Sequence, residues 1–205
     1  MKLESVGIIV ELRPFGERDL IGKVFTQGYG VLCGMFKAGQ VSKSKPQVGQ
    51  MGRVSWNARL EAQLGAFHFE NEKNLIAGIF GDAAELARAS AAFALLAAML
   101  PEREAYPALY MDTLALAAGA FSYLDWEIHL LAEMGYAMAL GSCGNCGTED
   151  NLEFISPKTA RAICAECGRP FTDKLFKMPL TLETTKYFLS QIADLPVARN
   201  LIPDR

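Results

Sequence analysis

Two pairs of cysteines, each with two residues between its members, constrain this sequence more than any other feature. Cys143 and Cys146 form the first pair, and Cys164 and Cys167 form the second after seventeen intervening residues. Each pair can form a tight turn whose thiolates point at one centre, and two such turns complete a tetrahedral set of four sulfur ligands. The spacing therefore predicts a small knuckle, at about residues 141–170, that is held together by one structural zinc ion (Zn²⁺).

Other uses of these cysteines compete with structural zinc. A redox-active dithiol needs one such pair beside a βαβ unit, whereas this chain has two pairs and no such unit. Iron–sulfur ligation by four cysteines is chemically possible and stays open. A zinc deaminase would use the H-x-E motif of His68 and Glu70. Its signature, however, has proline before the first cysteine, where this chain has Ser142, and it leaves the second pair without a role.

The sequence around the cysteines also predicts local structure. Gly147 and Gly168 each follow the second cysteine of a pair, where a knuckle turn needs a residue that tolerates positive φ. Between the pairs we expect a short hairpin around Pro157, with strands at 152–155 and 161–163.

Short β-strands are predicted in the first third of the chain. Alternating or apolar runs bounded by turn residues occur at 6–10, 21–26, 31–36, 52–59 and 65–69. Gln27–Gly30 separates the second run from the third with glycines that can take positive φ, which is typical of a hairpin. Five short strands within about seventy residues favour a small closed barrel of the OB type over an open sheet, which would leave edges to protect.

Helical patterns begin near residue 75. Asp82, with Glu85 three residues later, is expected to cap a helix that Pro101 ends. Pro107 is expected to open a second helical stretch, which Gly119 interrupts and Gly135 ends. In its second part, one face at helical spacing is expected to hold Phe121, Leu124, Ile128 and Leu131, and a last helix is expected at 182–195. The predicted fold is therefore α+β, with a barrel at 1–78 and a helical domain at 79–205 that carries the knuckle.

Positive charge is concentrated at the start of the chain. Residues 1–59 hold nine basic and four acidic residues, a net charge of +5, and the remainder has a net charge of −8. Because OB-type barrels bind nucleic acid with a charged groove and exposed aromatic rings, we predict a nucleic-acid interface on the barrel. Its candidate cations are Arg13, Lys23, Lys37, Lys43, Lys45, Arg53 and Arg59, and its candidate stacking rings are Trp56, Tyr29 and Phe36. A solvated surface with chance clustering of charge is the alternative.

Nothing in the sequence is typical of export or membrane insertion. The most apolar uncharged run, at 89–101, is too short to cross a bilayer. We expect a cytoplasmic protein with reduced thiols, in which paired cysteines indicate a metal site rather than disulfides. The remaining cysteine, Cys33, is expected to be a small buried hydrophobic residue.

Several short motifs follow one another over nearly the whole chain. They include 12–20 (LRPFGERDL), 30–32 (GVL), 37–39 (KAG), 56–61 (WNARLE), 99–103 (MLPER), 126–136 (WEIHLLAEMGY), 156–158 (SPK) and 174–179 (KLFKMP). In this order and spacing they resemble the RecO family of bacterial DNA repair and recombination proteins. Two differences stand out. Ala160 occupies a position where the family usually has glycine, and the chain ends at Arg205, where relatives usually continue with another helix and a basic tail.

The resemblance implies an N-terminal OB barrel and a helical domain, with a zinc knuckle in some members. It implies a recombination mediator rather than an enzyme, one that binds single- and double-stranded DNA and anneals complementary strands. It also implies that the protein acts with RecR to help load RecA onto strands coated by SSB. The C-terminal tail of SSB is expected to dock within residues 79–205, and the protein is expected to associate with the nucleoid.

Overall fold

The computed structural model describes residues 1–37, 45–59 and 64–202. These residues group into two compact units, one formed by 1–123 together with 195–202 and the other by 124–194. The boundary between residues 78 and 79 stays a prediction. None of the described helices is long and apolar enough to cross a membrane.

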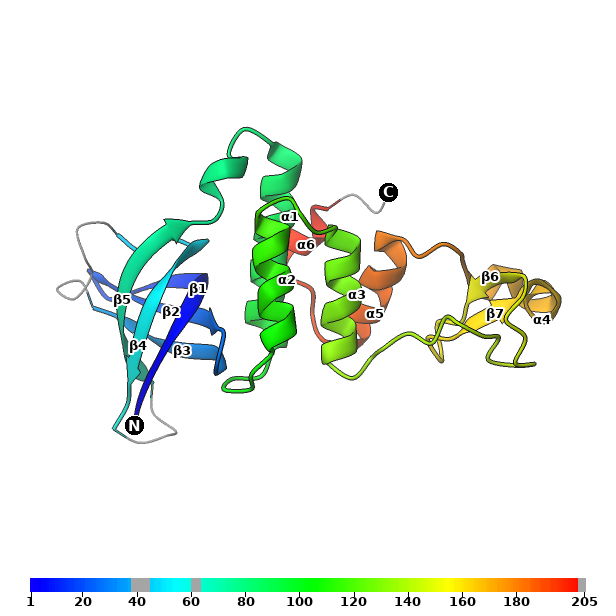
Figure 1. Ribbon diagram of the computed structural model, residues 1–205, viewed down its shortest axis with the longest axis horizontal. Coiled ribbons are helices and arrows are strands. Elements are labelled where there is room, and N and C mark those ends of the chain that lie inside the picture. The colour runs from blue at the N-terminus through cyan, green and yellow to red at the C-terminus, as the bar shows by residue number, and fades with distance from the viewer. Residues whose placement is uncertain (38–44, 60–63, 203–205) are drawn as a thin grey trace. The chain divides into compact units, whose positions relative to one another are not determined.

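The first unit begins with a closed five-stranded barrel, shown in blue and cyan in Figure 1. Its strands are β1 (Lys2–Phe15), β2 (Asp19–Thr26), β3 (Gly30–Phe36), β4 (Gln50–Asn57) and β5 (Gly65–Asn74). They close in the order β1-β2-β3-β5-β4, and only β3 and β5 run parallel. The α+β prediction with an N-terminal OB-type barrel is confirmed.

Strand β1 is longer than its alternating apolar pattern predicted. A register shift between Ile9 and Glu11 bends the strand, so that its first half pairs with β4 while its second half pairs only with β2. Beyond the shift, Arg13 and Pro14 are exposed and give no apolar signal. The bend allows one strand to join both sides of the closed barrel.

The barrel is filled by apolar side chains that alternate along its strands. Phe36 and Phe67 pack with ring centroids 4.8 Å apart, and Trp56 lies in the same buried cluster. The indole Nε1 of Trp56 donates a hydrogen bond of 2.8 Å to the carbonyl oxygen of Cys33. Gly65 leaves room for this ring, since a Cβ there would lie 2.1 Å from it. The barrel core is therefore closely packed around a hydrogen-bonded indole.

Helix α1 (Ala83–Met99) follows the 3₁₀ turn η1 (Ala77–Ile79) and begins at its predicted cap. Asp82 Oδ1 accepts hydrogen bonds from the backbone N–H groups of Ala84 and Glu85. Helix α2 (Pro107–Ala117) starts at its predicted proline and ends two residues before Gly119, which has a φ of 70°. The short helix α6 (Val197–Asn200) packs on α1 and had no counterpart in the sequence prediction.

Helix α1 and the segment after it lie against the barrel. Lys23 Nζ donates a hydrogen bond of 2.6 Å to the carbonyl oxygen of Ala97, near the C-terminus of α1, where a cation is favoured. The N–H of Arg103 donates to the carbonyl oxygen of Val31 at 2.9 Å, and its guanidinium lies 5.0 Å from the ring centroid of Trp56. These contacts tie the barrel to the first helix of the chain.

The second unit contains most of α3 (Tyr123–Glu133) and all of α5 (Leu182–Ile192). Gly135, with a φ of 85°, ends α3 as predicted, and the N–H of Tyr136 donates to the carbonyl oxygen of Leu131. Of the residues predicted to share one face, Leu131 is fully buried, while Phe121, Leu124 and Ile128 are partly buried. The other fully buried side chains of α3 are Trp126, Glu127 and Leu130.

Helix α5 is linked to α3 by a buried hydrogen bond. Thr185 Oγ1 donates to Glu127 Oε2 at 2.5 Å, and both side chains are inaccessible to solvent. The helix ends at Ile192, three residues before the predicted end, because Ala193 adopts extended backbone angles. Pro196 therefore marks the start of α6 rather than the end of α5.

A small knuckle separates α3 from α5 along the chain. It contains a three-stranded sheet in the order β7-β6-β8, with β6 (Leu152–Ile155), β7 (Ala162–Cys164) and β8 (Phe176–Lys177). A one-turn helix α4 (Ala165–Gly168) and a 3₁₀ segment η2 (Arg169–Lys174) connect β7 to β8. The predicted hairpin of β6 and β7 is confirmed.

Candidate metal centre and nucleic-acid interface

The four cysteines of the knuckle converge on one point. The sulfur atoms of Cys143, Cys146, Cys164 and Cys167 all lie within 4.8 Å of one another, and those of Cys146 and Cys164 are 3.7 Å apart. Tetrahedral zinc with bonds of about 2.3 Å to sulfur places its ligands about 3.8 Å apart. The cluster can therefore hold one metal ion, and its donor set and spacing fit zinc.

The two cysteine turns are built differently. In the first, the N–H of Gly147 donates to the carbonyl oxygen of Cys143 at 2.9 Å, and Gly147 has the predicted positive φ, at 79°. In the second, Cys164 precedes α4 and Cys167 lies within that helix. The prediction of positive φ at Gly168 was wrong, because Gly168 has a φ of −81°. Glycine is required there for space, since a Cβ would lie 2.4 Å from the Phe154 ring.

Hydrogen-bond donors point at the sulfur atoms and favour their charged form. The N–H of Cys164 donates to Cys143 Sγ at 3.4 Å, and Asn145 Nδ2 donates to Cys167 Sγ at 3.2 Å. Backbone N–H groups of Cys146, Cys164 and Asn145 lower the pKa of Cys143 to about 6. The first thiolate of the cluster is therefore stabilised by the fold itself.

The thiol of Cys146 is harder to ionise than that of Cys143. The backbone of Thr148 favours the thiolate of Cys146, but the neighbouring thiol of Cys143 and burial outweigh it and raise the pKa of Cys146 to about 12. Four adjacent thiolates need a cation to balance them, because like charges in one site disfavour ionisation. The electrostatics of the cluster are thus those of a metal site rather than of four free thiols.

The H-x-E pair lies on the barrel. His68 and Glu70 are exposed on β5, and His68 Nε2 is 3.6 Å from Glu70 Oε1. Together with Lys2 and Arg53 they line an open groove of about 560 Å³ over β1, β4 and β5. The four-sulfur cluster is complete without a ligand from this pair.

Three of the predicted interface cations lie at one end of the barrel. Strands β1 and β3 both pair antiparallel with β2, so Arg13, near the end of β1, and Lys37, just after β3, lie on the same side. Strand β4 runs antiparallel to β1, so its start, which follows Lys45, lies at that end as well. We call Arg13, Lys37 and Lys45 the basic rim. All three side chains are exposed, and no ion pair involving Lys37 or Lys45 occurs within the described parts of the chain.

The other predicted cations have different surroundings. Arg59 is exposed two residues after β4, at the other end of the barrel, and Lys43 lies outside the described residues. Arg53 is exposed on β4 and pairs with Glu72 at 3.0 Å. Lys23 is mostly buried by its bond to α1 and also lies 3.9 Å from Glu11, which pairs with Arg13 at 2.9 Å. Part of the positive charge is therefore neutralised by neighbours or used in packing.

Trp56 is not a stacking platform. The residue is 1% exposed, its Nε1 is hydrogen-bonded, and Arg103 covers its ring, so no face is open to a base. Phe36 is equally buried, whereas Tyr29 is exposed in the turn after β2. The sequence prediction missed Phe15, which is 49% exposed beside the β1–β2 turn. Its position directly before Gly16, at the end of a strand rather than inside it, could have indicated this exposure.

Cys33 and His129 belong to neither site. Cys33 is half-buried in β3, and burial raises the pKa of its thiol. His129 lies on α3 with its Nε2 3.1 Å from Glu133 Oε1, as expected of a packing or surface histidine.

Comparison with known proteins gives matches over both halves of the chain. A family model described as "Recombination protein O N terminal" matches residues 1–70, and one described as "Recombination protein O C terminal" matches residues 81–200. The protein named DNA repair protein RecO from Rhodospirillum centenum is 39% identical over 189 residues, which cover 87% of this chain and 76% of the relative. Its namesake from Roseobacter denitrificans is 35% identical over 215 residues, covering 93% of this chain and 89% of the relative. The chain therefore belongs to the RecO family of DNA repair proteins.

Proposed function

We propose that this chain is a recombination mediator that binds single- and double-stranded DNA through the basic rim of its barrel and is not itself an enzyme. The observation that carries the proposal is the combination of family membership with a closed OB-type barrel whose exposed cations gather at one rim. Cations on a folded scaffold bind DNA by displacing counterions from phosphates, which needs no catalytic group.

The rim offers contacts to the DNA backbone rather than to base edges. Lys37 extends from the end of β3, and Lys45 adds an exposed cation in the segment before β4. Phe15 stands at the end of β1, two residues from Arg13, and can stack on an unpaired base. Binding is therefore expected to depend weakly on sequence and strongly on salt.

Zinc is proposed to have a structural role in this function. Four thiolates fill a tetrahedral site and leave no position for a reacting water. The ion would join the two cysteine turns and so hold the β6–β7 hairpin. Two features of the chain favour metal binding: Cys143 supplies a thiolate of low pKa, and Asn145 Nδ2 donates a hydrogen bond to Cys167 Sγ.

The proposed partners follow from the family's role in recombination. We propose that the protein acts with RecR to help load RecA onto SSB-coated strands and anneals complementary strands. The C-terminal tail of SSB is proposed to dock within residues 79–205, and the protein is proposed to work on the nucleoid in the cytoplasm.

A zinc-dependent deaminase using His68 and Glu70 is the second candidate function. It would require His68 to join the first cysteine pair around zinc. Cys146 instead lies 3.7 Å from Cys164, which supports a site that is already filled by sulfur. Release of ammonia from a cytosine-containing oligonucleotide by the zinc-loaded chain would support the deaminase and contradict the mediator.

Direct tests use the intact chain. Fluorescence anisotropy should detect binding to labelled oligo(dT) and to a duplex of mixed sequence, and both affinities should fall steeply between low and physiological salt. Annealing of complementary strands coated with SSB should be faster with the chain present, and faster again when RecR is added. Absence of binding to either DNA at low salt would contradict the proposal.

A further inference from the structure

A second groove lies on the knuckle, which follows the barrel in the sequence. It has a volume of about 630 Å³ and is lined by the first cysteine turn, the turn after β6, the η2 segment and the middle of α5. Its apolar walls are Pro157, Ile163, Phe171, Leu175 and Tyr187. The Tyr187 ring is fixed by edge contacts with Phe176 and Phe188, whose centroids lie 5.2 and 5.4 Å away. The groove is therefore partly preformed by packed aromatic rings.

Apart from Cys167, which belongs to the metal cluster, the charged side chains that line this groove are both basic. Lys158 and Lys174 are exposed, and no side-chain hydrogen bond or ion pair of either is found among the described residues. The surrounding sequence agrees, since residues 156–177 contain five basic and two acidic residues. This segment is therefore basic, although the chain beyond residue 59 has a net charge of −8. The groove is suited to an anionic ligand.

Phe171 is the most unusual residue of the groove. It is 54% exposed and interrupts the η2 segment with non-helical backbone angles, φ −132° and ψ 20°. An exposed ring beside two free lysines is the arrangement that binds unpaired bases, with the ring stacking on the base and the cations on the phosphates. Asn145 donates its amide N–H to Cys167 Sγ, which leaves its Oδ1 free to accept a hydrogen bond from a base.

We propose that this groove is a second contact site for single-stranded nucleic acid, with a base stacked on Phe171 and phosphates held by Lys158 and Lys174. The inference rests on the proposed DNA-binding function and adds a site outside the barrel. An acidic peptide with an apolar side chain is the competing ligand. Polar Asn145 and Ser156 among the lining residues, together with the exposed aromatic ring, favour a base over an aliphatic side chain.

Tryptophan fluorescence can report on this groove in the intact chain. Trp56 and Trp126 are the two natural tryptophans and are 1% and 0% exposed, so oligo(dT) should barely quench them. The Phe171→Trp variant keeps a stacking ring, and its added fluorescence should be quenched by oligo(dT) in a saturable way. Phe171→Ala should bind oligo(dT) about tenfold more weakly, as expected for the loss of one stacked base.

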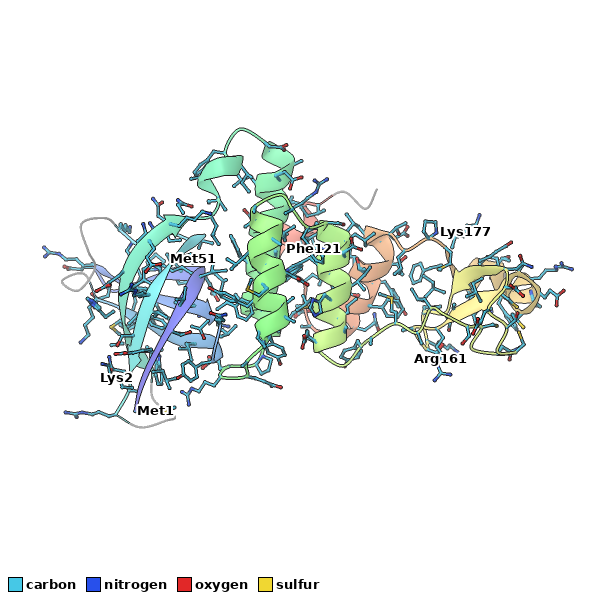
Figure 2. All side chains as sticks on the ribbon, viewed as in Figure 1. Met1, Lys2, Met51, Phe121, Arg161 and Lys177 are labelled. Atoms are coloured by element: carbon cyan, nitrogen blue, oxygen red, sulfur yellow. The ribbon has the colours of Figure 1, made fainter. Side chains whose placement is uncertain are left out.

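Charge variants test the phosphate contacts. Lys158→Glu with Lys174→Glu should flatten the salt dependence of single-strand binding by about 1.4 in slope, or about 0.7 for each lost contact. Lys177→Glu is the matched control on the same knuckle, because Lys177 is exposed on β8 but does not line the groove. Figure 2 labels Lys177 on the knuckle, with its side chain extending from the surface. Phe80→Ala, at another exposed phenylalanine, controls for the loss of a ring.

The outcomes separate this inference from the proposed function. If the parent chain binds oligo(dT) and the groove variants bind equally well, with the introduced tryptophan unquenched, the groove is not a nucleic-acid site and only this inference fails. If the parent chain does not bind oligo(dT), the proposed function and this inference both fail. Quenching by a synthetic peptide of three aspartates and a C-terminal phenylalanine, but not by oligo(dT), would make the groove a peptide site and overturn the inference.

Discussion

Ala160 holds the turn between β6 and β7 in a conformation that most residues avoid. Its φ of 53° lies in the left-handed region, where a Cβ crowds the following carbonyl oxygen and costs about 1–2 kcal/mol. The turn is nevertheless well bonded, since the N–H of Ala160 donates to the carbonyl oxygen of Ser156 at 2.9 Å and its own carbonyl oxygen accepts from Ala139 at 3.0 Å. The hydrogen bonds of the knuckle hairpin offset the unfavourable backbone at this position.

Ala160→Gly should therefore stabilise the protein. Removal of the Cβ relieves the backbone strain of the folded state, and this gain outweighs the loss of stability caused by the greater freedom of glycine in the unfolded chain. The free energy of unfolding should rise by about 0.5–1 kcal/mol. Chemical denaturation of the zinc-loaded protein measures this change. The control is Ala162→Gly, a buried position in β7, which should lower the stability. A decrease for Ala160→Gly as well would refute the strained turn.

Residue-level prediction from the sequence succeeded where the cause was local. Gly147 has positive φ because its turn returns directly to Cys143, which the cysteine spacing reveals. Gly168 and Trp56 depend on contacts with residues distant in sequence and were misjudged. One local signal for Trp56 was present, because Val54 and Trp56 share the inward face of β4 while Arg53 faces outward, as strand alternation requires.

At the scale of elements, caps and breakers located the helices better than apolar spacing did. Asp82 and Gly135 mark a start and an end that the structure confirms. Apolar spacing gave no indication that Glu127 is buried in α3, because its carboxylate accepts a hydrogen bond from Thr185 in a helix far along the chain. A buried carboxylate that is bonded across elements leaves no apolar signal in its own sequence.

The knuckle is an element whose stability should depend on metal. The freshly purified chain is expected to contain about one equivalent of zinc, and Cys164→Ser should lose most of it and unfold at a lower temperature, because binding at such a site is part of the folding free energy. Metal analysis and thermal unfolding provide the measurements. Cys33→Ser is the control, since Cys33 lies in the barrel outside the cluster and should keep its zinc. Iron in place of zinc would instead indicate an iron–sulfur centre, and absence of both metals would count against the site.

Considered as a whole, the molecule carries its excess positive charge near the start of the chain, but only part of that charge is available to a ligand. The sequence showed the excess of +5 over residues 1–59. It could not show that Lys23 bonds to helix α1 or that Arg53 pairs with Glu72, because these partners come from later segments. Nor could it show that strand pairing brings Arg13 to the end of the barrel that holds Lys37 and Lys45, and leaves Arg59 at the other end. Closure of the barrel sets which cations face outward together.

DNA is proposed to bind the basic rim through its phosphates. The most direct test is the salt dependence of oligo(dT) binding by the parent chain, by Lys37→Glu with Lys45→Glu, and by the charge-matched control Lys73→Glu with Arg88→Glu. The rim variant should bind more weakly with every DNA sequence, and the slope of log affinity against log salt should fall by about 1.4 relative to the parent. The control, with its changes on β5 and α1, should keep nearly the parental slope. Equal slopes for the rim variant and the parent would contradict the account.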